Sequence, residues 1–300
     1  MAAVGVALIV NPFSSGVRRD LVEDVERVLR RYVEPLELHL TEARDHATEL
    51  ARAAAAEGHT IVVFAGDGTY NEAINGAAGA ATFGFIPGGG TSVLPRALGL
   101  PRDPLLATGK IGEAIQAGGV RTISLGRANG RLFAFAAGVG FDADVVRRVD
   151  RRGRREDGRR APNSAFVAAA LGAFAGSGFH LGESIEIEGH GRAAFILVAN
   201  GAPYTYAGSV RFRLARESTF EDGLAWVAPR TVWPVSAGTL VYRAFRGTAP
   251  RARNVFAGID DDRLVIRCDT PQPFQVDGED LGDVTEVEFL AVRNALTVVS

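Results

Sequence analysis

The stretch Thr60–Glu72 reads TIVVFAGDGTYNE, and it decides the fold of the first part of the chain. Its first five residues are β-branched or aromatic, which predicts a buried strand. Gly-Asp-Gly-Thr follows at 66–69, and the pattern from Tyr70 to Ala78 is helical. A strand that leads through glycines into a helix presents free N–H groups and one carboxylate, which suit phosphates and Mg²⁺. Gly-Asp-Gly is also common turn chemistry, so this stretch alone leaves both interpretations open.

Two further turns favour the phosphate interpretation. The apolar stretch at 83–86 ends in Pro-Gly-Gly-Gly-Thr-Ser at 87–92, and the strand expected at 4–10 leads into Asn-Pro-Phe-Ser-Ser-Gly at 11–16. Because parallel strands end at the same edge of a sheet, we expect the three turns to face one crevice.

The pattern of apolar, helical and strand-like segments along the chain predicts two domains. Residues 1–120 alternate apolar runs (4–10, 36–40, 60–64, 83–86) with helical patterns (18–33, 43–57, 70–78, 92–98, 103–117), as a doubly wound parallel sheet does. From 121 onward the segments are short and strand-like, which predicts an antiparallel β-sandwich with two or three inserted helices. We therefore expect an α/β domain at 1–120, to which a strand near 292–300 could return, and a β-sandwich domain at 121–291.

Composition narrows the class of protein. The chain has 300 residues, 47% of them hydrophobic, and a net charge of -2, so no nucleic-acid partner is expected. A single cysteine, Cys268, excludes an intramolecular disulfide, and the five histidines show no metal-ligand spacing. The first residues lack a basic leader, which favours a cytoplasmic protein. The apolar tract at 165–179 is too short to span a bilayer and predicts a buried or interfacial helix.

Residues 147–160 hold eight arginines and three acids. Such a segment is either a solvated loop or a patch that contacts an anionic membrane at its inner face. A homodimer through edge strands of the second domain is also left open.

Taken in order, the motifs resemble the bacterial diacylglycerol kinase and sphingosine kinase-like lipid kinases, which share the diacylglycerol kinase catalytic domain. The resemblance is carried by Asn-Pro at 11–12, Thr41, Gly-Asp-Gly-Thr at 66–69 with Asn-Glu at 71–72, Pro-Gly-Gly-Gly-Thr at 87–91, Gly-Val-Gly-Phe-Asp at 138–142, Asn-Gly at 200–201, Asp-Gly at 222–223 and Gln-Val-Asp-Gly-Glu at 275–279. The 66–69 motif alone also resembles NAD kinases.

The resemblance implies an ATP-dependent kinase that transfers the γ-phosphate to a lipid hydroxyl, such as that of diacylglycerol or a long-chain base, in a cleft between the two domains. It implies that Glu279 is the general base and that Asp67 acts near the Mg²⁺ of ATP. The residues expected to hold the nucleotide are Asn11, Thr41, Gly66, Gly68, Thr69, Asn71, Gly89, Gly90 and Thr91. A structural Mg²⁺ is expected at Asp222, with the backbones of Thr219 and Leu224.

Three residues, in two places, depart from the family pattern. Ala225 stands where an acid is frequent, and Val93-Leu94 stands where many relatives carry Asn-Asp. The alternatives that remain open are a kinase of a soluble acceptor such as NAD, or a regulator that binds nucleotide or lipid without catalysis. Plain turns at 221–223 and 277–279 are open too, since Asp-Gly is a strong turn signal.

Overall fold

The computed structural model describes residues 5–151, 163–201, 203–207 and 210–300. The chain divides into two compact units. Unit 1 contains the described residues up to 123 together with 294–300, and unit 2 contains the described residues from 124 to 293.

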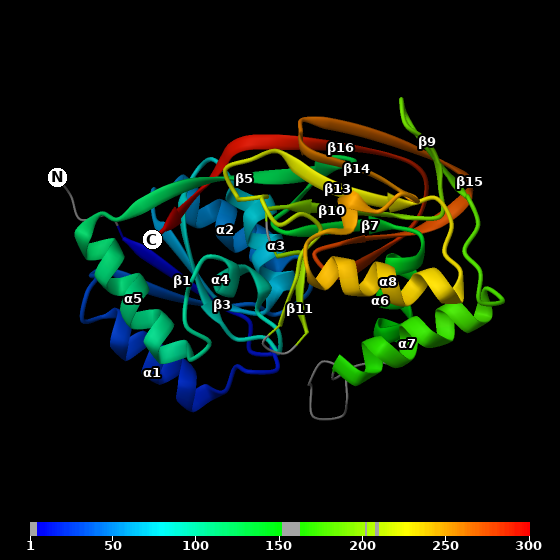
Figure 1. Cartoon of the computed structure of the whole chain (residues 1–300). Coiled ribbons are helices and arrows are strands. Elements are labelled where there is room, and N and C mark those ends of the chain that lie inside the picture. The colour runs from blue at the N-terminus through cyan, green and yellow to red at the C-terminus, as the bar shows by residue number, and fades with distance from the viewer. Residues whose placement is uncertain (1–4, 152–162, 202, 208–209) are drawn as a thin grey trace. The chain divides into compact units, whose positions relative to one another are not determined.

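Unit 1 is a parallel sheet with helices on its faces (Figure 1). The sheet order is β4-β3-β1-β2, and the last residues of β16 pair with β4 in parallel. Its elements are β1 (Val6–Val10), α1 (Arg19–Leu29), β2 (Leu36–Leu40), α2 (His46–Ala56), β3 (Thr60–Ala65), α3 (Asp67–Ala77), β4 (Thr82–Pro87), α4 (Val93–Ala97) and α5 (Pro104–Ala117).

Both faces of this sheet are buried. Val6, Leu8 and Val10 of β1 pack in one apolar cluster with α1 and α5, whereas α2 and α3 pack on β1 and β3. The ring of Tyr70 in α3 packs edge-on against the ring of Phe85 in β4, and the two ring centroids are 5.2 Å apart. Continuous apolar strands of this kind are typical of parallel sheets covered on both sides.

Unit 2 is an antiparallel sheet region with three helices among its described residues. Its main strand order is β14-β13-β10-β7-β15-β16, and the large buried side chains of its core include Trp226, Phe133 and Phe289. Its elements are β5 (Val120–Ala128, which begins in unit 1), β6 (Arg131–Phe133), β7 (Ala136–Val139), α6 (Phe141–Arg151), α7 (Asn163–Gly176), β8 (Ile185–Ile187), β9 (Gly191–Ala193), β10 (Ile196–Asn200), β11 (Thr205–Ala207), β12 (Val210–Phe212), β13 (Leu224–Pro229), α8 (Pro234–Phe245), a 3-10 turn η1 (Ala249–Arg251), β14 (Val255–Asp261), β15 (Arg263–Val276) and β16 (Glu279–Val299).

The predicted fold class, an α/β part followed by an antiparallel β part, is confirmed. Two local predictions were wrong. The helix expected from Tyr70 begins at Asp67, so Gly-Asp-Gly-Thr lies at its first turn. The alternating pattern at 131–137 predicts one strand, but these residues form β6 and the start of β7, because the N–H groups of Ala134 and Phe135 donate to the Asp277 carboxylate instead of a neighbouring strand.

The apolar tract at 165–179 falls in α7 and the turn after it. Within the described ranges, no helix combines the length and the hydropathy that a membrane-spanning helix requires.

Candidate functional site

The three polar turns of unit 1 meet at the carboxyl ends of β1, β3 and β4, as the sequence predicted. The N–H of Gly16 donates to the carbonyl of Gly88 at 2.8 Å, and the N–H of Gly66 donates to Ser14 Oγ at 3.3 Å. A Cβ on Gly89 would lie 2.8 Å from the Cα of Gly66, so the two glycine turns touch backbone to backbone. This contact needs glycine because a side chain would separate the turns.

Helix α3 starts inside this group of turns. Its N-cap is Gly66, in extended conformation, and no side chain caps the helix. The first N–H groups of a helix have no partner within the helix, and the helix dipole adds a partial positive charge there. The turn of residues 66–69 therefore presents anion-binding groups.

The side chain of Thr69 contacts the turn that follows β1. Its hydroxyl oxygen accepts a hydrogen bond from Asn11 Nδ2 at 2.8 Å, and Asn11 Oδ1 accepts the N–H of Phe13 at 2.9 Å. Asn11 and Thr69 thus tie the turn after β1 to the first turn of α3.

Asp67 is buried, and its carboxylate has an unexpected partner. One oxygen accepts the N–H of Val93 at 3.0 Å and the other accepts the N–H of Leu94 at 3.2 Å. The carboxylate therefore caps α4 and holds the turn at 87–92 against α3. Carboxylate oxygens are ligands that Mg²⁺ prefers, so Asp67 is a candidate for contact with Mg²⁺ or its bound water.

The other predicted nucleotide residues lie around these turns. Thr41 is buried, and its N–H donates to the carbonyl of Val10 at 2.9 Å. Asn71 is buried and accepts hydrogen bonds from Asn75. Gly68 and Thr91 are partly exposed and Gly90 is exposed.

Sequence reasoning missed two residues that shape this region. Ser92 is buried at φ 46°, and its hydroxyl accepts the N–H of Gly89 at 3.1 Å. The Tyr70 hydroxyl lies 2.6 Å from the carbonyl oxygen of Ala65 and 2.7 Å from that of Ile86, between β3 and β4. Burial, with the nearby Asp67 charge, raises the pKa of Tyr70 well above its usual value. The Gly-Gly-Gly-Thr-Ser run carried a signal for Ser92, but nothing local pointed to Tyr70.

In unit 2, Asp277 and Gly278 form the tight turn between β15 and β16. Asp277 and Gly278 have φ of 48° and 79°, as a type I′ hairpin turn requires. The buried Asp277 carboxylate accepts three N–H groups, from Ala134 at 2.8 Å and from Phe135 and Ala136 at 3.0 Å. The Asp-Gly pair is thus a hairpin turn that is also fastened to the β6–β7 connection.

Glu279 follows this turn at the first position of β16. Its side chain is 27% exposed, and its Oε2 lies 3.3 Å from an Arg131 guanidinium nitrogen. The turn that carries it is held by Gln275, whose Oε1 accepts the N–H of Gly278 at 2.9 Å. Glu279 is therefore a partly accessible carboxylate on a well-supported turn.

Gln275 also joins a polar group that the sequence did not reveal. Its Nε2 donates to Asp142 Oδ2 at 2.8 Å, and the Tyr204 hydroxyl donates to the same oxygen at 2.7 Å. Although part of the Asp142 residue reaches solvent, its carboxyl group is enclosed, and this burial raises its pKa. Burial, together with the Asp142 charge, also raises the pKa of Tyr204.

The contacts at Asp222 are those of a turn. Asp222 Oδ2 accepts both the N–H of Thr219 at 2.7 Å and its hydroxyl at 3.0 Å, and the N–H of Asp222 faces the carbonyl of Thr219 at 3.4 Å. Leu224 lies in β13 and is paired with Asn200 and Asp261. These contacts involve Oδ2 and match the turn alternative, and the Mg²⁺ expected at Asp222 stays a prediction.

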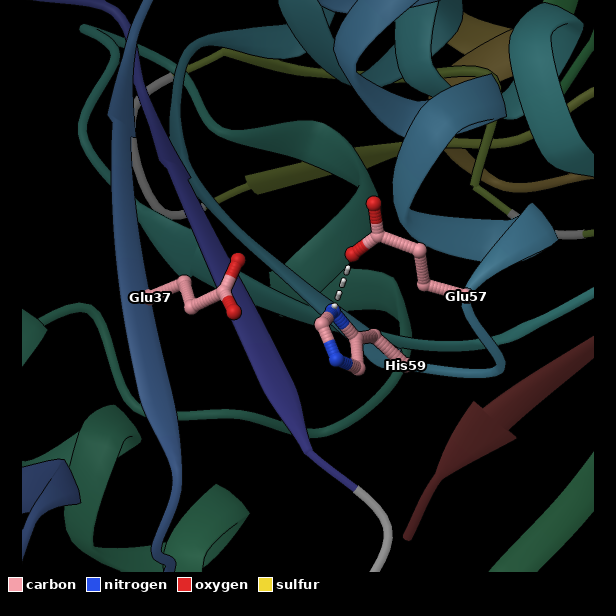
Figure 2. Close-up of side chains that lie close together, drawn as sticks. All are labelled: Glu37, Glu57 and His59. Carbon is pink, nitrogen blue, oxygen red and sulfur yellow. Dashed lines mark ion pairs between the residues drawn. The ribbon is translucent and has the colours of Figure 1, made fainter.

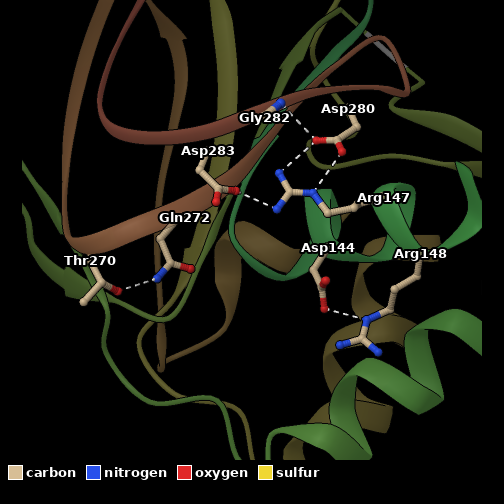
Figure 3. A network of polar contacts seen from close by, with 8 residues as sticks. All are labelled: Asp144, Arg147, Arg148, Thr270, Gln272, Asp280, Gly282 and Asp283. Atoms are coloured by element: carbon tan, nitrogen blue, oxygen red, sulfur yellow. Dashed lines mark hydrogen bonds and ion pairs between the residues drawn. The ribbon is translucent and has the colours of Figure 1, made fainter. Parts of the chain in front are cut away.

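The arginine-rich segment at 147–160 lies mostly outside the described residues. Figure 3 shows its beginning, where Arg147 donates to Asp280 and Asp283 and Arg148 donates to Asp144. The hydrogen bond to Asp280 is the main cause that raises the pKa of Arg147. These two arginines are therefore already neutralised by carboxylates of unit 2.

One histidine cluster appears that spacing did not predict. Figure 2 shows Glu37, Glu57 and His59, whose nearest ligand atoms lie within 4.8 Å of one another. His59 Nδ1 is 3.7 Å from Glu57 Oε2, and both glutamates are largely exposed. We interpret the cluster as an ion pair beside a third charge, because exposed acidic groups are common without a metal ion.

The comparisons with known proteins agree with the motifs. Residues 5–128 match the family model of the diacylglycerol kinase catalytic domain. Diacylglycerol kinase of Bacillus subtilis (strain 168) is 34% identical over 140 residues, which are 44% of this chain and 45% of that protein. A second match, to a protein of Streptococcus pneumoniae, covers 49% of that protein. The chain thus spans about half the length of the curated relatives that it matches.

Solved structures extend the likeness to the fold of the whole chain. A crystal structure of a diacylglycerol kinase from Bacillus anthracis str. Sterne has a TM-score of 0.70 at 20% identity, and covers 100% of this chain and 97% of that one. An NAD kinase from Archaeoglobus fulgidus, solved in complex with ATP, has a TM-score of 0.51 at 12% identity over 98% of this chain and 93% of that chain. The predicted resemblance is confirmed: residues 5–128 match the model of the diacylglycerol kinase catalytic domain, and the whole chain has the fold of diacylglycerol kinase structures.

Proposed function

We propose that this protein is an ATP-dependent lipid kinase, a phosphotransferase whose acceptor is an alcohol group of diacylglycerol or of a similar long-chain lipid. The observation that carries the proposal is the match of residues 5–128 to a kinase catalytic domain in the same region where three turns converge. A lipid acceptor is proposed because the curated Bacillus subtilis relative is a diacylglycerol kinase.

In this proposal unit 1 binds the nucleotide. The N–H groups at the start of α3 and the glycines at 88–90 would donate to phosphate oxygens, because a helix N-terminus and close-approaching glycines suit an anion. Asn11, Thr41, Thr69, Asn71 and Thr91 would complete the nucleotide site. Asp67 would hold Mg²⁺, which neutralises charge on the transferred phosphoryl group.

Glu279 is proposed as the general base. A carboxylate within hydrogen-bond reach of the acceptor hydroxyl can remove its proton as the oxygen attacks the γ-phosphorus. The hydrogen bonds of Asp277 and Gln275 support this role, since they fix the turn on which Glu279 stands. The structural Mg²⁺ expected at Asp222, with the backbones of Thr219 and Leu224, stays a prediction and contributes no step here.

The partners of the proposed enzyme are ATP and a lipid at a membrane surface, which places it in the cytoplasm at the inner membrane face. Membrane contact through 147–160 stays a prediction, as does a homodimer. A soluble acceptor such as NAD is supported only by the fold that the chain shares with an NAD kinase.

The test is transfer of labelled γ-phosphate from Mg²⁺-ATP to diacylglycerol, a long-chain base or other lipids in detergent micelles, and to NAD without lipid. We expect lipid phosphorylation, and we expect Glu279→Gln to lower it by about 100-fold, the contribution of a general base. Glu286→Gln is the control, because this exposed glutamate on the same strand only pairs with Arg267.

Unchanged transfer in Glu279→Gln would rule out the base. Transfer to NAD but to no lipid would show that the acceptor is NAD and not a lipid. ATP binding without transfer to any acceptor would favour a regulator, the alternative that Val93-Leu94 suggested.

A further inference from the structure

The solvent side of α8 is apolar. Val235 is 92% exposed, Tyr242 62% and Val241 52%, and Trp233 just before the helix is 54% exposed. Helical spacing puts Val235, Gly238 and Tyr242 on one stripe. A continuous apolar stripe that faces water marks a contact surface.

Helix α7 adds a second uncharged surface in the same part of unit 2 (Figure 1, green and yellow helices). It contains no charged residue, and its Val167 and Leu171 are 61% and 65% exposed. Phe174 of this helix packs in one cluster with Ala237 and Leu240 of α8. The rings of His180 and Trp233 lie 3.9 Å apart and connect the end of one helix to the start of the other.

A hollow of about 340 Å³ adjoins the apolar stripe. Arg243, Arg253 and Thr239 are among its lining residues, and Leu240 and Val255 contribute apolar walls. Thr239 and Arg243 stand four and eight residues after Val235, on the helical stripe beside it. The hollow and the exposed stripe therefore form one surface, which we call the α8 surface.

The charge of the α8 surface has one sign. From residue 224 to 259 the chain carries five arginines, at 230, 243, 246, 251 and 253, and no aspartate or glutamate. Arg230 pairs with Glu183 and Arg251 pairs with Glu217. In the part of the chain that the structure describes, the Arg243 and Arg253 side chains form no ion pair. Unpaired arginines beside a threonine hydroxyl are suited to a phosphate group.

We propose that the α8 surface docks unit 2 on a bilayer that contains anionic phospholipids. Val235 and Tyr242 enter the boundary of the acyl chains, Trp233 lies at the level of the headgroups, and Arg243 and Arg253 donate to a lipid phosphate. The inference rests on the proposed function, because a lipid acceptor is presented by such a bilayer.

A second copy of the chain fits this surface less well. A two-fold dimer places the same patch on both subunits, so the arginines of one copy would meet an acid-free patch that carries the same arginines. An anionic bilayer supplies the opposite charge, and a cluster of arginines next to exposed aromatic and aliphatic side chains is the usual composition of an interfacial helix.

The experiment is co-sedimentation of the full chain with vesicles of phosphatidylcholine and phosphatidylglycerol, without ATP or acceptor. We expect Arg243→Gln with Arg253→Gln to weaken binding by about 30-fold at low salt, since each basic side chain at an anionic surface contributes about five-fold. We expect Val235→Ser with Tyr242→Ser to weaken it by about 10-fold, from lost apolar burial. Vesicles of phosphatidylcholine alone should bind poorly.

Two matched controls lie in unit 1: Arg52→Gln, an exposed arginine of α2, and Leu106→Ser, 65% exposed on α5. Both should bind vesicles like the parent chain, and all variants should keep its melting temperature. Equal vesicle binding by parent and α8 variants would overturn the inference. So would α8 variants that lose only self-association in sedimentation velocity, because a second copy would then cover the surface.

The micelle assay above separates the two proposals. Vesicle binding that depends on the α8 surface, with no phosphorylation in micelles, would leave the docking inference standing and reject the kinase. Phosphorylation in micelles with vesicle binding unchanged in the α8 variants would do the reverse.

Discussion

At the scale of single residues, the buried aspartates act through backbone N–H groups. Asp67 accepts the N–H groups of Val93 and Leu94, which any residue other than proline could supply. The replacement of Asn-Asp by Val93-Leu94 therefore leaves this contact of Asp67 intact. Asp277 is similar, because its three N–H donors come from residues 134–136. In both cases the sequence showed the carboxylate and the tertiary structure supplied its partners.

Asp142 makes the stability of the protein depend on pH. Burial raises the pKa of its carboxyl above the reference value of 3.8, so the folded protein binds this proton more tightly than the unfolded chain does. The contribution of Asp142 to the free energy of unfolding is therefore largest below pH 3.8 and decreases as the pH rises through the folded-state pKa.

We expect Asp142→Asn to remove this decrease, because an amide oxygen still accepts from Tyr204 and Gln275 but does not ionise. Melting temperatures should be measured from pH 4 to pH 8 at intervals of about one pH unit. As the pH rises, they should fall less in Asp142→Asn than in the parent chain. Asp144→Asn on the same helix is the control, since Asp144 instead pairs with Arg148. Parallel pH profiles for the parent and Asp142→Asn would contradict the assignment.

At the scale of elements, periodicity located the helices and strands of unit 1 to within a few residues. The expected helix at 103–117 is α5, and the expected strand at 60–64 is β3. The boundaries that differed are those where tertiary partners compete for backbone groups, as at β6 and β7. Element positions follow from local chemistry, whereas element ends depend on where the terminal N–H and carbonyl groups find partners.

The close packing of α2 and α3 gives an element-scale prediction. A Cβ on Gly76 would lie 2.3 Å from the carbonyl oxygen of Thr48, which is backbone and cannot rotate away. We expect Gly76→Ala to lower the free energy of unfolding by about 1–3 kcal/mol, since overpacking outweighs the better helix propensity of alanine.

Gly109→Ala in α5 is the matched control, because nothing lies within 4 Å of the added Cβ. This variant should be unchanged or more stable by up to about 1 kcal/mol. Urea unfolding of both variants checks the prediction, and equal midpoints would show that α2 moves to accommodate the methyl group.

At the scale of the whole molecule, unit 1 is built from distant parts of the chain. Thr297 and Val298 pair with Thr82 and Phe83 of β4, and Leu296, Val298 and Val299 are buried. Each buried aliphatic side chain contributes about 1.5–3 kcal/mol. The last seven residues therefore contribute an amount comparable to the stability of an ordinary domain.

We expect removal of residues 294–300 to unfold unit 1 at a much lower temperature than in the parent chain, while unit 2 keeps its own transition. Calorimetry with a control that lacks only Ser300, whose side chain is exposed, checks this. An unchanged melting profile of the longer deletion would show that β4 is stable as an edge strand.

The sequence by itself determined the strands, the helices and the three glycine-bearing turns, and the order of these motifs indicated the family. These features depend on neighbouring residues, because periodicity, β-branching and glycine turns are local properties. Only the tertiary structure decided that Asp67 caps α4, that Asp222 closes a turn with Thr219, and that α8 leaves an apolar stripe exposed beside Arg243 and Arg253. The physical reason is that the partners of a carboxylate, and the burial of a helix face, are set by residues that lie far away along the chain.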